Sequence, residues 1–254
     1  MLDSDPLKTI PEQLAALEAT LRWKLRRKEI IESLRTLMAA VDRPRLDALR
    51  RQHEASIREA SAVSGYKYLD VAFYTLQKLL LARDLGLNVG PPRRVLDIGT
   101  GGGHFPFVCR FFGHQVVGID IENPIYEGIA ACLGVRRTIV RVEPLRPLPN
   151  LGERFDLITA SDITFNDKAD RDGRRHYWSL AEWKFFLDDL IANQLRYPGR
   201  LYLRPNKEFQ APLRGVTPLV YNRELLALAA RNGATVSRRH GTIELSVTSR
   251  REIR

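Results

Sequence analysis

The sequence predicts an α/β fold: a seven-stranded, mostly parallel sheet with helices on both of its faces, preceded by an N-terminal helical lobe. Three observations predict this fold. From about residue 64 onward, short apolar runs alternate with segments of helical periodicity. A glycine-rich turn follows the first of these runs. Residues 1–63, in contrast, carry helical periodicity alone, so we expect them to form a lobe that is separate from residues 64–254.

The stretch from Arg94 to Asp120 carries the clearest pattern in the chain and reads RVLDIGTGGGHFPFVCRFFGHQVVGID. An apolar strand that contains Asp97 leads into a turn with glycines at positions 99, 101 and 103. A helical segment and a second apolar strand follow, and this strand ends at Asp120. The order of strand, glycine-rich turn, helix, strand and acid predicts one half of a Rossmann-like nucleotide-binding sheet. An acid at the end of the second strand, such as Asp120, can accept hydrogen bonds from a ribose diol.

The glycine spacing argues against a dinucleotide. A G-x-G-x-x-G fingerprint that starts at Gly99 requires a third glycine at position 104, where this chain has His104. The observed pattern, D-x-G-x-G-x-G, resembles the first motif of the class I S-adenosylmethionine-dependent methyltransferases, and the resemblance covers about residues 64–254. It implies that the loop surrounds the methionine part of S-adenosylmethionine, with Asp97 near the ammonium group and Asp120 on both ribose hydroxyls. This cofactor has no phosphate and its charged amino and sulfonium groups are cationic, so carboxylates suit it.

The resemblance implies ten cofactor contacts, which come from five segments of the chain. They are Tyr68 ahead of the first strand, Asp97, Gly99, Thr100, Gly101 and Gly103 in that strand and the turn, Asp120 and Ile121 after the second strand, Glu143 after the third, and Ser161 after the fourth. Glu143 is expected near the adenine. Tyr68 is expected near the cofactor carboxylate or the substrate, with a packing role as the alternative. No metal site is legible, so S-adenosylmethionine is the one cofactor that we expect.

The remaining elements follow from periodicity and from turn signals. We expect strands at 137–143, 155–160 and 200–205, helices at 66–85, 124–133, 180–195 and 222–232, and a closing antiparallel pair at 234–239 and 242–248. Ser179 and Glu182 predict a capping box at the start of the third of these helices. In the resembling family the last strand runs antiparallel to the others, as this closing pair requires.

Catalytic candidates must come from loops at the carboxyl edge of the sheet, because ligands bind there in open α/β folds. Methyl transfer mainly requires alignment of the reacting groups, with a base where the acceptor is a hydroxyl group. Asp162, which follows the fourth strand, is the first candidate for that base, and a capping or cofactor-side contact is its alternative role. His104 is the second candidate. The weaker candidates are His176 and Asn166, and Arg204 and Asn206 are suited to orienting an anionic or polyhydroxyl acceptor.

The sequence also disfavours some acceptors. Enzymes that methylate the exocyclic nitrogens of bases carry [DNS]-P-P-[YFW] after the fourth strand, where this chain reads Ser161-Asp162-Ile163-Thr164. The sequence therefore favours a small-molecule, sugar or lipid-precursor acceptor, methylated at oxygen, and we expect no sequence-specific nucleic acid partner. An RNA methyltransferase and a non-catalytic cofactor-binding partner protein stay open as alternatives. A dehydrogenase is the least favoured.

Composition places these expectations in a cellular context. The chain has 254 residues and a formal net charge of +10, and residues 200–254 hold 11 basic and four acidic side chains. This excess is dispersed, which is typical of a solvated face, although an anionic substrate is a second interpretation. The sequence shows no apolar run near 18 residues and no signal-peptide pattern, and its two cysteines have no disulfide or metal spacing. We therefore expect a cytoplasmic protein with reduced thiols.

The N-terminal lobe is expected to be a helical hairpin. Apolar residues recur at helical spacing over residues 12–41, Pro44 interrupts the pattern, and a second helix runs from about 46 to 63. Such a hairpin must bury its apolar face on the core domain or on another subunit, so a homo-oligomer through these helices stays open. Its basic residues also permit contact with an anionic membrane surface, although the acids Glu18, Glu29 and Glu32 favour packing.

Overall fold

Seven strands form one sheet in the order β3-β2-β1-β4-β5-β9-β8 in the computed structural model. The structure describes residues 5–21, 27–59, 65–165, 177–209 and 219–254. The strands are β1 (Arg94–Ile98), β2 (Gln115–Asp120), β3 (Arg137–Ile139), β4 (Phe155–Ile163), β5 (Leu195–Pro205), β8 (Thr235–Ser237) and β9 (Thr242–Val247). Strands β2 and β3, β1 and β4, and β4 and β5 pair in parallel, whereas β9 is antiparallel to both β5 and β8. The predicted fold class is confirmed.

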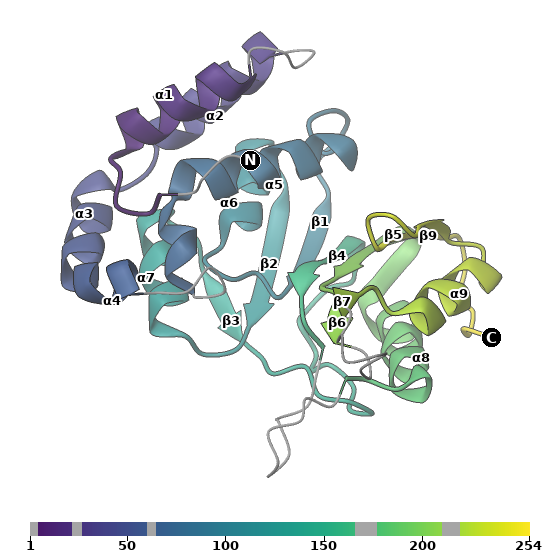
Figure 1. Cartoon of the computed structure of the whole chain (residues 1–254). Coiled ribbons are helices and arrows are strands. Elements are labelled where there is room, and N and C mark those ends of the chain that lie inside the picture. The colour runs from purple at the N-terminus through teal and green to yellow at the C-terminus, as the bar shows by residue number, and fades with distance from the viewer. Residues whose placement is uncertain (1–4, 22–26, 60–64, 166–176, 210–218) are drawn as a thin grey trace. The chain divides into compact units, whose positions relative to one another are not determined.

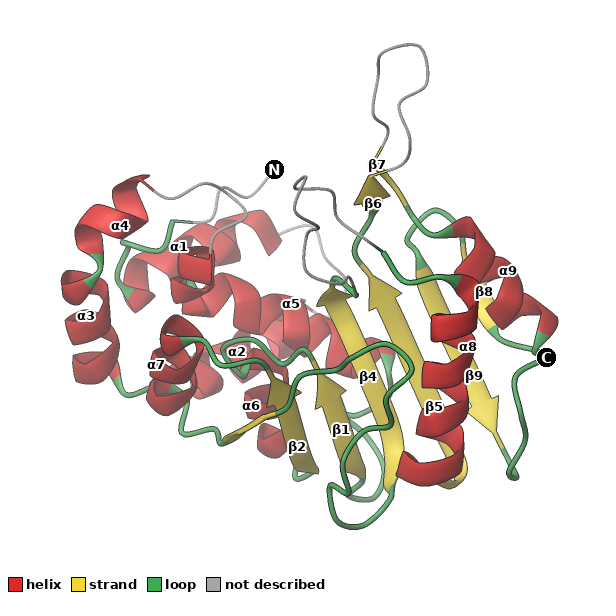
Figure 2. Cartoon of the chain, turned by 90° about the horizontal axis from the view of Figure 1, so that it is seen from below, coloured by secondary structure: helices red, strands yellow, loops and turns green. Residues whose placement is uncertain are grey.

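The chain forms two compact units. One comprises Met1–Pro92 and Thr100–Ile139, and the other comprises Arg93–Gly99 and Val140–Arg254. The first unit contains α1 (Ile10–Leu21), α2 (Arg27–Ala39), α3 (Arg43–Gln52), α4 (Glu54–Glu59), η1 (Gly65–Leu69), α5 (Val71–Asp84), α6 (His104–Phe111) and α7 (Pro124–Cys132). The second contains α8 (Leu180–Asp189), its π-helical extension η2 (Leu190–Gln194) and α9 (Arg223–Arg231). Figure 2 shows α8 and α9 beside strands of the second unit.

The single helix that we expected over residues 12–41 is wrong. Helices α1 and α2 are separate and lie side by side (Figure 1), and the Arg35 guanidinium donates to both carboxylate oxygens of Glu18, at 2.7 and 2.9 Å. In a continuous helix these residues would be about 25 Å apart along the axis, since each residue rises about 1.5 Å. The periodicity did not separate the two helices because both bury apolar residues and both pack on α5.

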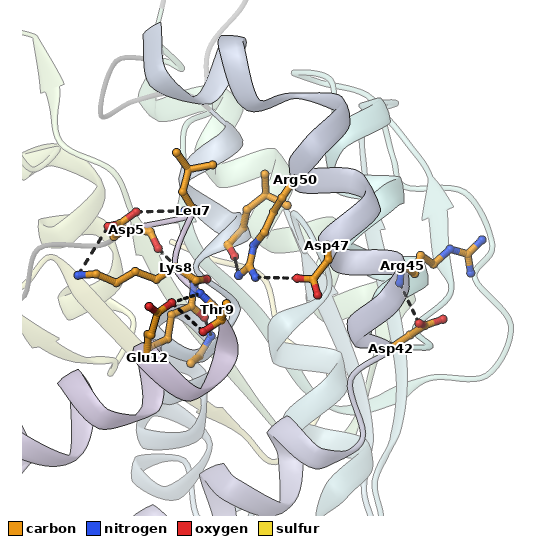
Figure 3. Close-up of polar contacts among 12 residues, drawn as sticks. Asp5, Leu7, Lys8, Thr9, Glu12, Asp42, Arg45, Asp47 and Arg50 are labelled. Carbon is orange, nitrogen blue, oxygen red and sulfur yellow. Dashed lines mark hydrogen bonds and ion pairs between the residues drawn. The ribbon is translucent and has the colours of Figure 1, made fainter.

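A buried arginine links the N-terminal helices to the rest of the first unit. Arg50 of α3 donates to the carbonyl oxygen of Leu69 at 2.8 Å and lies 3.4 Å from the Asp47 carboxylate (Figure 3). Burial lowers the pKa of Arg50, and the charges of Asp47 and Asp70 oppose this effect. The helices therefore pack on the segment that precedes β1, as the first of our alternatives for the lobe expects. The boundary at 63/64 stays a prediction.

Two strands of the second unit are longer than the sequence pattern indicated. β4 extends to Ile163 and β5 begins at Leu195, so Ser161 and Asp162 are strand residues and do not lie in a loop. The pairing register shifts between Ser161 and Ile163, which places a β-bulge at Asp162. Helix α8 begins with the predicted capping box. The Ser179 side chain accepts a hydrogen bond from the Glu182 backbone N–H, and the Glu182 carboxylate accepts one from the Ser179 backbone N–H. The closing pair β8–β9 is also as predicted.

Other parts of the chain depart from the sequence pattern or add to it. β3 covers only residues 137–139, four residues short of the predicted strand, and η1 forms a 3₁₀ turn where the predicted helix 66–85 begins. A two-stranded ribbon, β6 (Glu208–Phe209) with β7 (Leu219–Val220), was not predicted. Both cysteines, Cys109 and Cys132, are buried free thiols, and burial raises the pKa of Cys132 to about 11. None of the described helices has the length and apolar character needed to cross a membrane.

Candidate functional site

The glycine-rich loop is tied to the end of β2 by hydrogen bonds to Asp120, the predicted ribose-side residue, and to Ile119. The backbone N–H of Gly101 donates to the Asp120 carboxylate at 2.6 Å, and the N–H of Ile121 donates to its other oxygen at 2.7 Å. The N–H of Thr100 donates to the Ile119 carbonyl at 3.1 Å. Asp120 is half-buried, so it stays accessible from solvent. The loop and the acid are therefore adjacent.

Gly101 leaves open space at the loop. Its φ of +56° is in the left-handed region that favours glycine, and a Cβ built on it would meet no protein atom within 4 Å. At Gly99, in contrast, a Cβ would lie 2.4 Å from the side chain of Ile163, so that glycine is required by packing. Gly103 caps α6 at φ +82°. Of the three predicted glycines, Gly101 is therefore the one whose missing side chain keeps space free for a ligand.

Aromatic residues surround the N-terminus of α6. Tyr68 of η1 has its ring centroid 4.6 Å from that of Tyr74, 5.6 Å from that of Tyr126 and 6.3 Å from that of His104. Tyr126 comes from α7, and burial followed by the negative charge of Asp120 raises its pKa. Tyr68 thus has the packing contacts that were its alternative role. Its contact with the cofactor stays a prediction.

His104 lies inside this aromatic cluster as a neutral imidazole. It is 3% exposed, and its Nδ1 lies 3.3 Å from the Thr75 hydroxyl. Burial, aided by the charge of Lys78 and opposed by a hydrogen bond with the Tyr68 backbone, lowers the pKa of His104 from 6.5 to about 3. A general base works best with a pKa near the working pH. The structure therefore favours a packing and hydrogen-bonding role for His104, and its catalytic role stays an untested prediction.

The low pKa of His104 predicts acid sensitivity of the fold. Between pH 6.5 and pH 3 the unfolded chain binds a proton that the folded chain excludes, so the free energy of unfolding falls as the pH falls. From pH 6.5 to pH 5.0 this one group is expected to contribute a loss of about 2 kcal/mol. Urea unfolding of the native protein and of His104→Gln at several pH values measures the difference. Exposed His240→Gln is the control, and parallel curves for the native and His104→Gln proteins would contradict the prediction.

In the second unit, Asp97 is buried on β1 beside β4. It is 5% exposed, and its Oδ1 accepts a hydrogen bond from the Thr159 hydroxyl at 2.7 Å. The two residues are register partners, and the Thr159 hydroxyl also lies 3.3 Å from the Leu96 carbonyl. Thr159 therefore fixes the orientation of the Asp97 carboxylate. Sequence reasoning missed Thr159, although pairing the first and fourth strands in register would have found it.

A polar cluster occupies the carboxyl end of β4 and β5. The Asp162 carboxylate accepts hydrogen bonds from Arg204 at 2.7 Å and from the Ser161 hydroxyl at 3.1 Å. Arg204 also donates to the Ser161 hydroxyl at 3.2 Å. Asn206 donates its side-chain amide to the Asp162 carbonyl at 3.1 Å and to the Thr164 hydroxyl at 3.0 Å. Three residues that the sequence singled out separately, Asp162, Arg204 and Asn206, are thus joined in one network.

Backbone strain accompanies this network. Asp162 has a φ of +63°, which is uncommon for a residue other than glycine and often marks a functional site. The Asp162 side chain is 41% exposed despite its ion pair. Arg204 is half-buried, and although desolvation lowers its pKa, the charge and hydrogen bond of Asp162 outweigh this and raise it. The carboxylate is therefore held in one place and stays accessible to solvent.

The other predicted site residues lie in different settings. Thr100 is 7% exposed, with its hydroxyl turned against Gly118 of β2, so only its backbone can face a ligand. Ile121 is 41% exposed. Glu143 lies in the loop after β3, where it forms an ion pair with Arg146, instead of directly following a strand. Asn166 and His176 lie outside the described residues.

Sequence reasoning also missed Tyr126. No motif marks it, because its place beside Tyr68 and Asp120 depends on the docking of α7 against η1. Arg137 has a similar position: its guanidinium lies 5.6 Å from the Tyr126 ring and donates to the Ile121 carbonyl at 2.8 Å. A tyrosine at the first turn of an amphipathic helix gives no signal that separates packing from ligand contact.

Comparison with known proteins gives structural matches only. No protein-family model matches the sequence, and no curated protein matches it. Among solved structures, the chain is similar to DesVI from Streptomyces venezuelae, with 12% identity over 74% of this chain and all of that chain, and a TM-score of 0.47. It is also similar to CalS10, an amino pentose methyltransferase from Micromonospora echinaspora, with 22% identity over 52% of this chain, a TM-score of 0.38, and a match to only half of that chain's length.

A TehB-like methyltransferase from Corynebacterium glutamicum matches with 13% identity over 80% of this chain and 98% of that chain, at a TM-score of 0.40. Such distant matches assign no activity. The strand order gives independent evidence on the fold, because it is the doubly wound order, β4 pairs in parallel with β1 and β5, β2 pairs in parallel with β3, and β9 is antiparallel to both of its neighbours. The chain therefore has the fold of the class I S-adenosylmethionine-dependent methyltransferases.

Proposed function

We propose that this protein binds S-adenosylmethionine and transfers its methyl group to an oxygen atom of a small-molecule, sugar or lipid-precursor acceptor. The observation that carries the proposal is the contact between the Gly101 backbone and the Asp120 carboxylate, next to the open space that Gly101 leaves. A nucleoside with a ribose diol needs an acid beside a loop that lets it approach closely. Both requirements are met within one unit of the molecule.

The residues present suit the chemistry of this cofactor. Asp120 offers carboxylate oxygens at the end of β2 for the ribose hydroxyls, and Asp97, oriented by Thr159, offers negative charge for an ammonium group. The D-x-G-x-G-x-G loop carries no basic side chain, as expected for a ligand without phosphate. Gly99, Gly103, Thr100 and Ile121 complete the proposed set through backbone and apolar contact. Glu143, Ser161 and Tyr68 belong to it on the resemblance alone.

The polar cluster at the end of β4 is proposed to bind the acceptor. When bound, the cofactor supplies a methyl group activated by a positively charged sulfur. Asp162 would accept the proton of the acceptor hydroxyl, and Arg204 would hold the carboxylate in place. Asn206 fixes the strained backbone at Asp162 through the carbonyl oxygen. The guanidinium of Arg204 also offers charge for an anionic or polyhydroxyl acceptor.

Calorimetric titration with S-adenosylhomocysteine, the demethylated product, tests the proposal. We expect saturable binding by the native chain and a clear loss in Gly101→Val, because the new side chain would fill the space beside Asp120. Gly90→Val is the control, since Gly90 also has a positive φ and an open Cβ position but lies outside the loop. Absence of binding by the native chain, or equal binding by Gly101→Val, would overturn the cofactor assignment.

The acceptor part of the proposal needs a second measurement. Transfer of labelled methyl from S-adenosylmethionine to panels of hydroxylated small molecules, sugar and lipid precursors and RNA identifies the acceptor class. Incorporation into RNA alone would replace the proposed acceptor by the nucleic acid alternative. Cofactor binding without turnover on any panel would favour a non-catalytic cofactor-binding protein.

A further inference from the structure

A cavity separate from the proposed cofactor residues lies in the C-terminal half of the chain, beside α9. It has a volume of about 680 Å³, within the range of small-molecule sites, and is lined by residues of the β6–β7 ribbon, α9 and the turn after β8. The lining residues that matter for its chemistry are Lys207, Tyr221, Arg223, Leu226, Arg238 and Arg239. All of them belong to one unit. None is among the residues assigned above to the cofactor or to methyl transfer.

The charged side chains that line this cavity are all positive. Four of its lining side chains are cationic and none is acidic. Within the described part of the chain, the guanidinium groups of Arg223, Arg238 and Arg239 have no ion pair and no hydrogen bond. The carboxylate of the nearby Glu208 accepts a hydrogen bond from the side-chain amide of Asn222 at 3.4 Å. Cations gathered without counter-charge repel one another, so an anion that binds among them relieves the repulsion.

The cavity also has an apolar and aromatic surface. Leu226 is 6% exposed and is one of the buried residues of α9. Tyr221 is half-buried and packs against the turn at Gly241, where a Cβ would lie 2.2 Å from its ring. Because Gly241 has no side chain, the Tyr221 ring can lie directly against this turn. Lys207 lies 5.3 Å from the centre of the same ring.

We propose that this cavity binds an organic phosphate. The phosphate or diphosphate group lies among Arg223, Arg238 and Arg239, because guanidinium groups can bind phosphate oxygens in pairs. The body of the ligand packs against Tyr221 and Leu226. A free anion would use only the first of these surfaces, so the combination selects a phosphate that carries a planar or apolar body. The site is independent of the cofactor assignment, because it shares no residue with it.

Binding of two probes tests the proposal. Inorganic pyrophosphate offers the anion alone, and uridine 5′-diphosphate offers the anion with a ring and has no adenine for the proposed cofactor site. Each is titrated calorimetrically into the full chain with excess S-adenosylhomocysteine present. We expect both to bind, uridine diphosphate more tightly, and the double variant Arg238→Gln, Arg239→Gln to weaken each at least tenfold. Tyr221→Leu is expected to weaken uridine diphosphate more than pyrophosphate.

A charge-matched control separates a site from general attraction. Arg231→Gln with Arg250→Gln removes the same charge from exposed positions outside the cavity and is expected to leave both affinities unchanged. Equal losses in the two double variants, or no binding of either probe by the native chain, would overturn the proposal. The proposal would also be overturned if a single-stranded oligonucleotide bound tightly and in a salt-sensitive manner, and if both double variants weakened this binding equally. Binding of S-adenosylhomocysteine, measured without the probes, reports separately on the cofactor site.

Discussion

Replacing Asp120 by asparagine is expected to weaken S-adenosylhomocysteine binding by roughly 10- to 100-fold. Hydrogen bonds from ribose hydroxyls to a charged acceptor each contribute about 1.5–3 kcal/mol, and every 1.4 kcal/mol is a factor of ten in affinity. The asparagine side-chain oxygen can still accept the Gly101 N–H, so the loop keeps its anchor. The variant therefore tests charge at the ribose position without dismantling the loop. Calorimetry measures the affinity directly.

Glu122→Gln is the matched control for this variant. Glu122 is exposed two residues further along the chain and loses the same charge on substitution. Its affinity for S-adenosylhomocysteine is expected to stay within about twofold of the native value, since exposed charges at such a distance interact weakly. If Asp120→Asn binds as well as the native chain, or if both variants weaken alike, the ribose assignment of Asp120 is wrong.

Replacing Asp162 by asparagine is expected to lower kcat at least 100-fold, with the affinity for S-adenosylhomocysteine unchanged. Loss of a positioned general base typically costs a factor of about 10²–10⁴. Asparagine also tolerates the left-handed backbone that Asp162 adopts, so the β-bulge is expected to survive. The measurement is turnover on the acceptor identified by the labelling panels, followed across pH. The acidic limb of the native pH–rate profile should vanish in the variant.

Arg204→Lys provides the comparison that separates a base from an ion-pair partner. Lysine keeps the charge beside Asp162 but loses the planar guanidinium, whose Nη2 donates to both Asp162 and the Ser161 hydroxyl. A modest fall in kcat with the acidic limb retained is expected for this variant. If Asp162→Asn turns over within threefold of the native rate, Asp162 is not the base. A pH–rate profile that keeps its shape in Asp162→Asn would exclude Asp162 from that role as well.

Features that depend on local spacing were predicted correctly from the sequence. The glycine turn, the acids at 97 and 120, the capping box at Ser179 and the inverted closing pair all occur where the residues indicated. Each depends on residues that are near neighbours along the chain or on a side-chain period that the sequence displays directly. The prediction of a single helix over residues 12–41 failed because two consecutive helices that pack on the same partner carry the same apolar periodicity as one long helix.

The sequence by itself determined the fold class, the glycine loop and its two acids, because turn geometry and strand patterning are local properties. The tertiary structure alone decided how the side chains group. It placed Thr159 on Asp97, joined Asp162 to Arg204 and Asn206, buried His104 as a neutral imidazole, and gathered three of the dispersed C-terminal arginines around one cavity. The first three of these groupings depend on strand register and helix docking, which bring together residues 29 to 62 positions apart. No spacing rule in a single sequence records such pairs.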